Sequence, residues 1–174
     1  ADAFNVVTTI RGTARSLPPL VIMTPRSGWW TCASERGGGL ACWLELMRGL
    51  QDNRPARDVH FVASTGHEIG YRGIEVFTER RPDLIQRGHA WIHLGANIGA
   101  AQQPGTILQA SSDEMEATLA SALANAGLAI NRKIPRGTMA AGEAGVVHRG
   151  GGRYVSLIGG NALFHHPADR GPDA

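Results

Sequence analysis

Short apolar runs recur along this chain and alternate with segments of helical pattern. Several runs are apolar at both odd and even positions, as strands covered on both faces of a sheet require. The expected strands are Val6–Ile10, Leu20–Met23, Val59–Ala63, Ala90–Leu94, Ile107–Ala110 and Tyr154–Ile158. Such alternation predicts an α/β fold of three layers, with a mostly parallel, mixed β-sheet between helices on both faces.

Three segments between these strands have helical spacing. Apolar residues recur at intervals of three and four over Leu40–Leu50 and again over Met115–Ala126. Ser111 followed by Glu114 has the spacing of a capping box at the start of the second helix. A third helix is expected over Ile69–Arg80, ended by the proline that follows.

Composition bounds the class of protein. The chain has 174 residues, which predicts a single domain over residues 1–174. A net charge of +2 without a basic run gives no reason to expect a nucleic-acid partner, and no apolar stretch has the length of a membrane span. No signal peptide opens the sequence, and neither the compartment nor the oligomeric state can be derived from it.

Two further local features carry predictions. Two cysteines do not make a disulfide framework, so both thiols are expected to be reduced. The glycine triplets Gly37–Gly39 and Gly150–Gly152 are predicted to form turns.

Polar residues of one chemical kind follow the predicted strands. Because the carboxyl ends of parallel strands meet at one edge, these side chains are expected near each other. Imidazole and carboxylate groups are the usual non-thiolate ligands of zinc, and three such ligands plus an open position make a hydrolytic site. The residues are Glu35, His67, Glu68, His93 and His165. A solvated loop residue is the competing interpretation for each of them alone.

Four segments, in this order, resemble the zinc aminopeptidases, a family that also contains the glutaminyl cyclases. They are Asn5–Gly12, Cys32–Gly39, Gly66–Gly73 and His165–Asp169. The first is similar to the opening strand, and the second to the loop that carries the metal-bridging aspartate. The third is similar to the paired-glutamate motif and the last to the closing His-Thr-Pro-Ala-Asp motif. Because the family usually continues with another helix, the resemblance also implies a chain truncated at its termini.

The resemblance implies a role for three of these residues. Glu35 is at the position of the aspartate shared by two zinc ions, and Glu68 and His165 are at ligands of one of those ions. It therefore implies one zinc ion held by these three residues, as in the cyclase branch.

Other positions differ from the family pattern. Thr24 and Arg26 are near the positions of a ligating histidine and aspartate, so a second metal is not expected to be held. His67 replaces the glutamate that serves as catalytic base, and an imidazole can take that role. His93 replaces an aspartate ligand and is expected to be a fourth ligand or a neighbour of the metal.

Four residues are candidates for substrate binding: Arg26, Trp29, Trp30 and Glu143. Arg26 would bind a carboxylate, the tryptophans would wall a pocket, and Glu143 would meet a substrate amine. The function predicted is that of a metal-dependent, aminopeptidase-like hydrolase of peptide or amino-acid-derived amides. Two alternatives stay open: a catalytically degenerate family member that binds a ligand or partner, and a single-zinc cyclase or amidase.

Overall fold

The apolar runs pair into one sheet. The computed structural model describes residues 2–29 and 31–171, in which the strand order is β1-β3-β2-β4-β7-β5-β6. The strands are β1 (Val6–Ile10), β2 (Leu20–Pro25), β3 (Val59–Ser64), β4 (Ala90–Leu94), β5 (Thr106–Ala110), β6 (Arg132–Lys133) and β7 (Tyr154–Gly159). The central strands β3, β2, β4 and β7 are parallel, whereas β1 and β5 run antiparallel to β3 and β7. The predicted mostly parallel, mixed sheet is confirmed.

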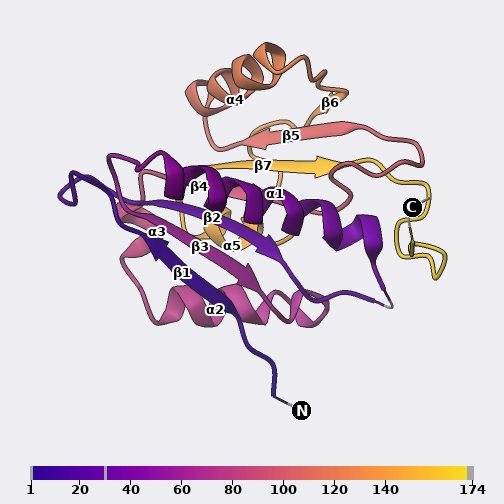
Figure 1. Cartoon of the computed structure of the whole chain (residues 1–174), viewed down its shortest axis with the longest axis horizontal. Helices are drawn as coiled ribbons and strands as arrows, with labels where there is room; N and C mark the ends of the chain where they lie inside the picture. The colour runs from indigo at the N-terminus through magenta and orange to yellow at the C-terminus, as the bar shows by residue number, and fades with distance from the viewer. Residues whose placement is uncertain (1, 30, 172–174) are drawn as a thin grey trace.

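Helices cover both faces of the sheet (Figure 1). They are α1 (Ala33–Asp52), the 3-10 helix η1 (His67–Ile69), α2 (Arg72–Glu79), α3 (Leu84–Arg87), α4 (Asp113–Asn125) and α5 (Ala144–Arg149). Val21 and Met23 of β2 face the core against α2, α3 and α5, while Ile22 between them faces α1. Helix α4 packs on β5 and β7. Because β2 is covered by helices on both faces, its odd-numbered and even-numbered residues are both apolar.

Helix α1 begins earlier than its apolar stripe predicts. It begins at Ala33, so Gly37–Gly39 are helical and the predicted turn there is wrong. A Cβ atom on Gly38 would lie 1.6 Å from the carbonyl oxygen of Ile98. The glycine is needed because the helix approaches the loop after β4 too closely for a side chain. The result is that Glu35 lies in the first turn of α1 rather than in a loop.

Two other helix starts differ from expectation. The helix expected over Ile69–Arg80 is divided, because Gly70 and Tyr71 adopt left-handed backbone conformations between η1 and α2. Ser112, not Ser111, is the N-cap of α4, with its hydroxyl accepting a hydrogen bond from Met115 N at 3.2 Å. The Ser111 hydroxyl instead accepts one from Tyr154 N.

Replacing Ser112 by alanine should weaken α4. We expect Ser112→Ala to lower the free energy of unfolding by about 1 kcal/mol, because the amide of Met115 loses its partner. Urea unfolding measures the difference, with Ser121→Ala on the exposed side of the same helix as control. Equal losses in both variants would contradict the assignment of the cap.

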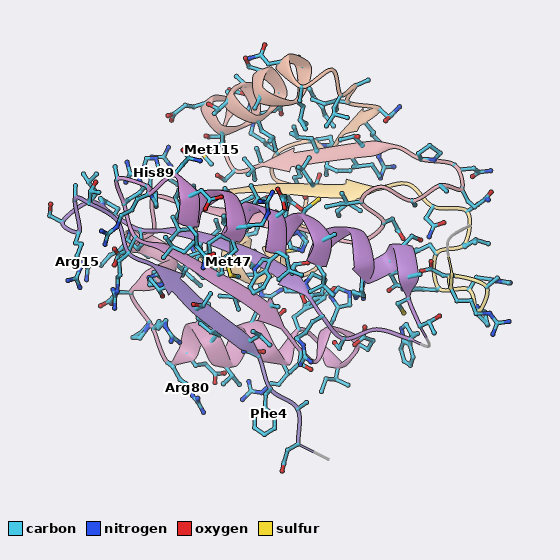
Figure 2. All side chains as sticks on the ribbon, in the orientation of Figure 1. Phe4, Arg15, Met47, Arg80, His89 and Met115 are labelled. Atoms are coloured by element: carbon cyan, nitrogen blue, oxygen red, sulfur yellow. The ribbon has the colours of Figure 1, made fainter. Side chains whose placement is uncertain are left out.

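The cysteines and the helix lengths test two predictions that were made from composition. Cys32 and Cys42 are both free thiols, as predicted. Burial and the neighbouring Glu35 raise the pKa of Cys32 to about 11, so this thiol stays protonated. None of the helices in the described residues is long and apolar enough to cross a bilayer. Arg80, at the end of α2, projects away from the body of the molecule (Figure 2).

Candidate active site

The polar residues of interest gather at one edge of the sheet. Strands β2, β3, β4 and β7 end there with parallel directions, and α1 begins there (Figure 1). A cavity of about 460 Å³ opens at this edge. Its lining includes His67, Tyr71, His93, Asn97, Phe164 and His165. Two polar clusters adjoin it, one built around an arginine and one around a glutamate.

The first, which we name the carboxylate–arginine cluster, consists of Glu35, Arg36 and Glu68. Arg36 Nη2 lies 2.9 Å from Glu35 Oε1 and 3.1 Å from Glu68 Oε1. The side chains of Arg36 and Glu35 are 5% and 1% exposed. Neighbouring α1 and η1 thus each contribute a carboxylate to one buried guanidinium. Because a lone buried charge is costly, the positive charge of Arg36 offsets part of the two negative charges.

The loop after β2 completes this cluster. The Ser27 hydroxyl donates to Glu68 Oε2 at 2.8 Å and accepts from the His67 backbone N–H at 3.1 Å. The Ser27 carbonyl accepts from Arg36 Nε. Burial alone would raise the pKa of Glu68, but the hydrogen bonds from Ser27 and Arg36 outweigh it and lower that pKa. Glu68 is therefore ionised at neutral pH.

The predicted zinc ligands do not form a metal site in this structure. Zinc lies about 2.0–2.2 Å from its oxygen and nitrogen ligands, so a bridging ion would need the space that Arg36 Nη2 fills. His165 comes near, with Nε2 at 3.5 Å from Glu35 Oε1, whereas His93 belongs to the second cluster. No group of three or more His, Cys, Asp or Glu side chains within residues 2–29 and 31–171 is placed to hold a metal. As they stand, the residues do not fit the zinc that the resemblance implies.

The second, the His–Glu–His cluster, consists of His67, Glu143 and His93. His67 Nδ1 lies 3.1 Å from Glu143 Oε1 and 3.2 Å from Oε2, and His93 Nε2 lies 3.4 Å from Oε2. Ser64 donates to Glu143 Oε1 at 3.1 Å. His93 Nδ1 pairs with the Ser156 hydroxyl at 2.8 Å. These contacts place one carboxylate between two imidazoles at the cavity.

Burial and charge set the protonation of this cluster. Glu143 is 0% exposed, and burial by itself would raise its pKa. The hydrogen bond from His67 and the close contact with His93 Nε2 outweigh burial and hold the pKa of Glu143 well below its usual range. The ionised carboxylate of Glu143 accepts a hydrogen bond from His67 Nδ1–H, so Nδ1 is the ring nitrogen that faces Glu143. Since His67 lines the cavity, Nε2 is the nitrogen left to meet a substrate.

The predicted substrate-binding residues have different outcomes. Arg26 donates from Nη1 to the carbonyl of Phe4 at 2.6 Å, on the N-terminal segment that leaves the sheet (Figure 2), and does not line the cavity. Glu143 is too buried to meet a substrate amine, so that role is corrected to holding His67. Trp29 is exposed, and Trp30 lies outside the described residues.

Two residues of the site were given no role by sequence reasoning. Arg36 has no role in the sequence-based prediction, although its place beside Glu35 is a signal that could have identified it. Asp169, at the end of the closing motif, accepts hydrogen bonds from the backbone amides of Ser34 and Glu35 at 2.8 and 2.9 Å. It also accepts one from the Ser34 hydroxyl at 2.6 Å. The C-terminal segment thereby caps α1 and positions Glu35.

The fold is that of the zinc aminopeptidases and glutaminyl cyclases, as the resemblance predicted. No family model and no curated protein matches the chain. Its likeness is to solved structures, at identities of 14–18%, which show the fold alone.

Three of these structures illustrate the likeness. An aminopeptidase from Aneurinibacillus sp. strain AM-1 has a TM-score of 0.81 and 18% identity, over 95% of this chain and 42% of that one. A zinc aminopeptidase from Bacillus subtilis has a TM-score of 0.79 and 15% identity, over 95% and 43%. A glutaminyl cyclase from an Acidobacteriales bacterium has a TM-score of 0.77 and 14% identity, over 95% and 65%. The chain thus spans less than half the length of the two aminopeptidases.

Proposed function

We propose that the chain is a hydrolase of small peptide-like amides, which bind in the cavity and are attacked by water activated by His67. One observation carries the proposal: a fully buried, ionised Glu143 holds Nδ1 of a histidine that lines a cavity. A carboxylate that fixes the imidazole tautomer is the arrangement of a general base and its orienting partner. The related fold of aminopeptidases supports the substrate class.

In this proposal His67 moves one proton in each direction. Its Nε2 takes a proton from water as the water oxygen bonds to the amide carbon, and the imidazolium is stabilised by Glu143. His67 then returns the proton to the departing amine nitrogen as the carbon–nitrogen bond breaks. Tyr71, which also lines the cavity and contacts the His67 ring edge-on, has a hydroxyl that can donate to the carbonyl oxygen.

The single zinc expected from the resemblance has no step in this proposal. Arg36 fills the position between Glu35 and Glu68, and it supplies positive charge there. Activity is therefore expected to persist in the presence of a chelator.

His67 and Glu143 are the residues to test. We expect His67→Ala to lower kcat by about 10²–10⁴-fold on aminoacyl anilides, the usual range for a lost general base. Glu143→Gln should lower kcat by a similar order with little change in KM, because the amide no longer holds the reactive tautomer. His89→Ala is the control, since His89 precedes β4, at the end of that strand opposite the site, and does not line the cavity. Unchanged kcat in both test variants would refute the role of His67.

A second candidate function is ligand binding without catalysis. It is favoured by Arg36, because the electrophilic metal of a hydrolase has no space between the two carboxylates. Saturable binding of dipeptides, with no turnover of anilides, esters or N-terminal glutamine peptides, would support it. Cyclisation of an N-terminal glutamine peptide would instead favour the cyclase alternative.

A further inference from the structure

The carboxylate–arginine cluster is arranged like a cation-binding site, with the guanidinium of Arg36 in the position of the cation. Glu35 and Glu68 come from α1 and η1, and they converge on the single atom Arg36 Nη2. Glu35 is 1% exposed as a side chain and Glu68 13%, so water screens their mutual repulsion poorly. A cation is required between them, and in this chain the residue next to Glu35 provides it.

The arginine is held in place by more than the two carboxylates. Its Nε donates to the Ser27 carbonyl, and its Nη1 donates to the Glu35 carbonyl at 3.2 Å. The stem of the side chain packs under the loop after β2, where a Cβ on Gly28 would lie 3.2 Å from Arg36 Cγ. These contacts hold the guanidinium between the carboxylates, so it does not leave when an ion approaches.

We propose that Arg36 is a built-in cation that takes the place of a metal ion, and that removing it uncovers a divalent-cation site. The ligands of that site would be Glu35, Glu68 and His165. His165 Nε2 is already 3.5 Å from Glu35 Oε1, a separation that ligands around one tetrahedral zinc ion can have. Because a metal and Nη2 compete for the same space, the wild-type chain is expected not to bind zinc at this position.

The test compares zinc binding and thermal stability in the wild type and in Arg36→Ala, Arg36→Lys and Arg36→Ala/Glu68→Gln. Zinc titration calorimetry and metal analysis should show no saturable site in the wild type, whose thermal midpoint should not respond to zinc or EDTA. Arg36→Ala should bind one zinc ion per chain. At about 100 times the dissociation constant, its midpoint should rise by roughly 5–10 °C. Adding Glu68→Gln should abolish both effects, and Arg36→Lys should keep the wild-type response.

Arg26→Ala is the matched control, because Arg26 binds the carbonyl of Phe4 outside the cluster. It should respond as the wild type does. If Arg36→Ala folds only when zinc is present, the proposal is supported; if it fails to fold with and without zinc, the uncovered site is refuted. One zinc per wild-type chain, lost in Glu68→Gln, would overturn the proposal directly. These readouts do not involve His67, so they stand or fall apart from the proposed catalysis.

Discussion

Gly38→Ala is expected to destabilise the protein by about 3 kcal/mol, the upper end of the usual cost of overpacking. The added methyl group would lie 1.6 Å from the carbonyl oxygen of Ile98 and 2.7 Å from its carbonyl carbon. Both are backbone atoms of the segment that follows β4, so no side-chain rotation relieves the overlap. Helix α1 would have to move away from the sheet edge and would carry Glu35 and Arg36 with it. We expect a lower midpoint of urea unfolding with an unchanged slope.

Gly37→Ala provides a matched control one residue away. No atom lies within 4 Å of a Cβ built at Gly37, and the residue is exposed in the same helix. Alanine has the higher helix propensity, so this variant should gain about 0.8–1.0 kcal/mol. The two substitutions are chemically identical and should have opposite signs. If both variants lose stability, or if neither does, then the contact with the Ile98 carbonyl is not the reason for a glycine at position 38.

Asp169→Ala is expected to lower the free energy of unfolding by about 2–4 kcal/mol at neutral pH. The carboxylate accepts from the Ser34 amide, the Ser34 hydroxyl and the Glu35 amide, and it is 2% exposed. Its loss would leave these donors buried at the positive end of a helix. Because Glu35 is anchored through its amide, the carboxylate–arginine cluster should loosen as well.

The same carboxylate predicts a pH dependence. Burial would raise the pKa of Asp169, but the hydrogen bonds from Ser34 and Glu35 outweigh it, so the pKa is lowered on folding. The stabilisation is therefore fully present above the unfolded pKa of about 3.9 and is lost as the pH falls through the folded pKa. Urea unfolding should show that the wild type has a higher free energy of unfolding than Asp169→Asn at pH 7, and that this difference becomes smaller in acid. Asp52→Asn, at the exposed far end of α1, should show no such difference.

Features of the fold that depend on a few neighbouring residues could be predicted from the sequence, whereas those that depend on residues distant in the chain could not. All six apolar runs became strands, because burial on both faces leaves a pattern visible in a few residues. The start of α1 was missed because Gly37–Gly39 resembled a turn, whereas the reason for Gly38 is the distant carbonyl of Ile98. That contact is set by the packed structure and has no local signature.

The sequence predicted where the residues of the candidate site lie, but not which side chains they contact. His67, Glu68 and Glu35 were expected at the sheet edge, and they lie there in two adjoining clusters. The direction of Arg36 and the burial of Glu143 could not be predicted, because both depend on which side chains surround them once the sheet has formed.

The tie between Asp169 and the start of α1 also bears on how the molecule forms on the ribosome. Strands β1, β3, β2 and β4 are neighbours in the sheet and are synthesised first, so they can pair before translation reaches residue 169. The hydrogen bonds to Ser34 span 135 residues, so the first turn of α1 stays uncapped throughout that time. Cavity-lining His165 also arrives with this late segment. The sheet can thus assemble as a nascent chain, whereas the site is completed only when the segment around residue 169 has emerged from the exit tunnel.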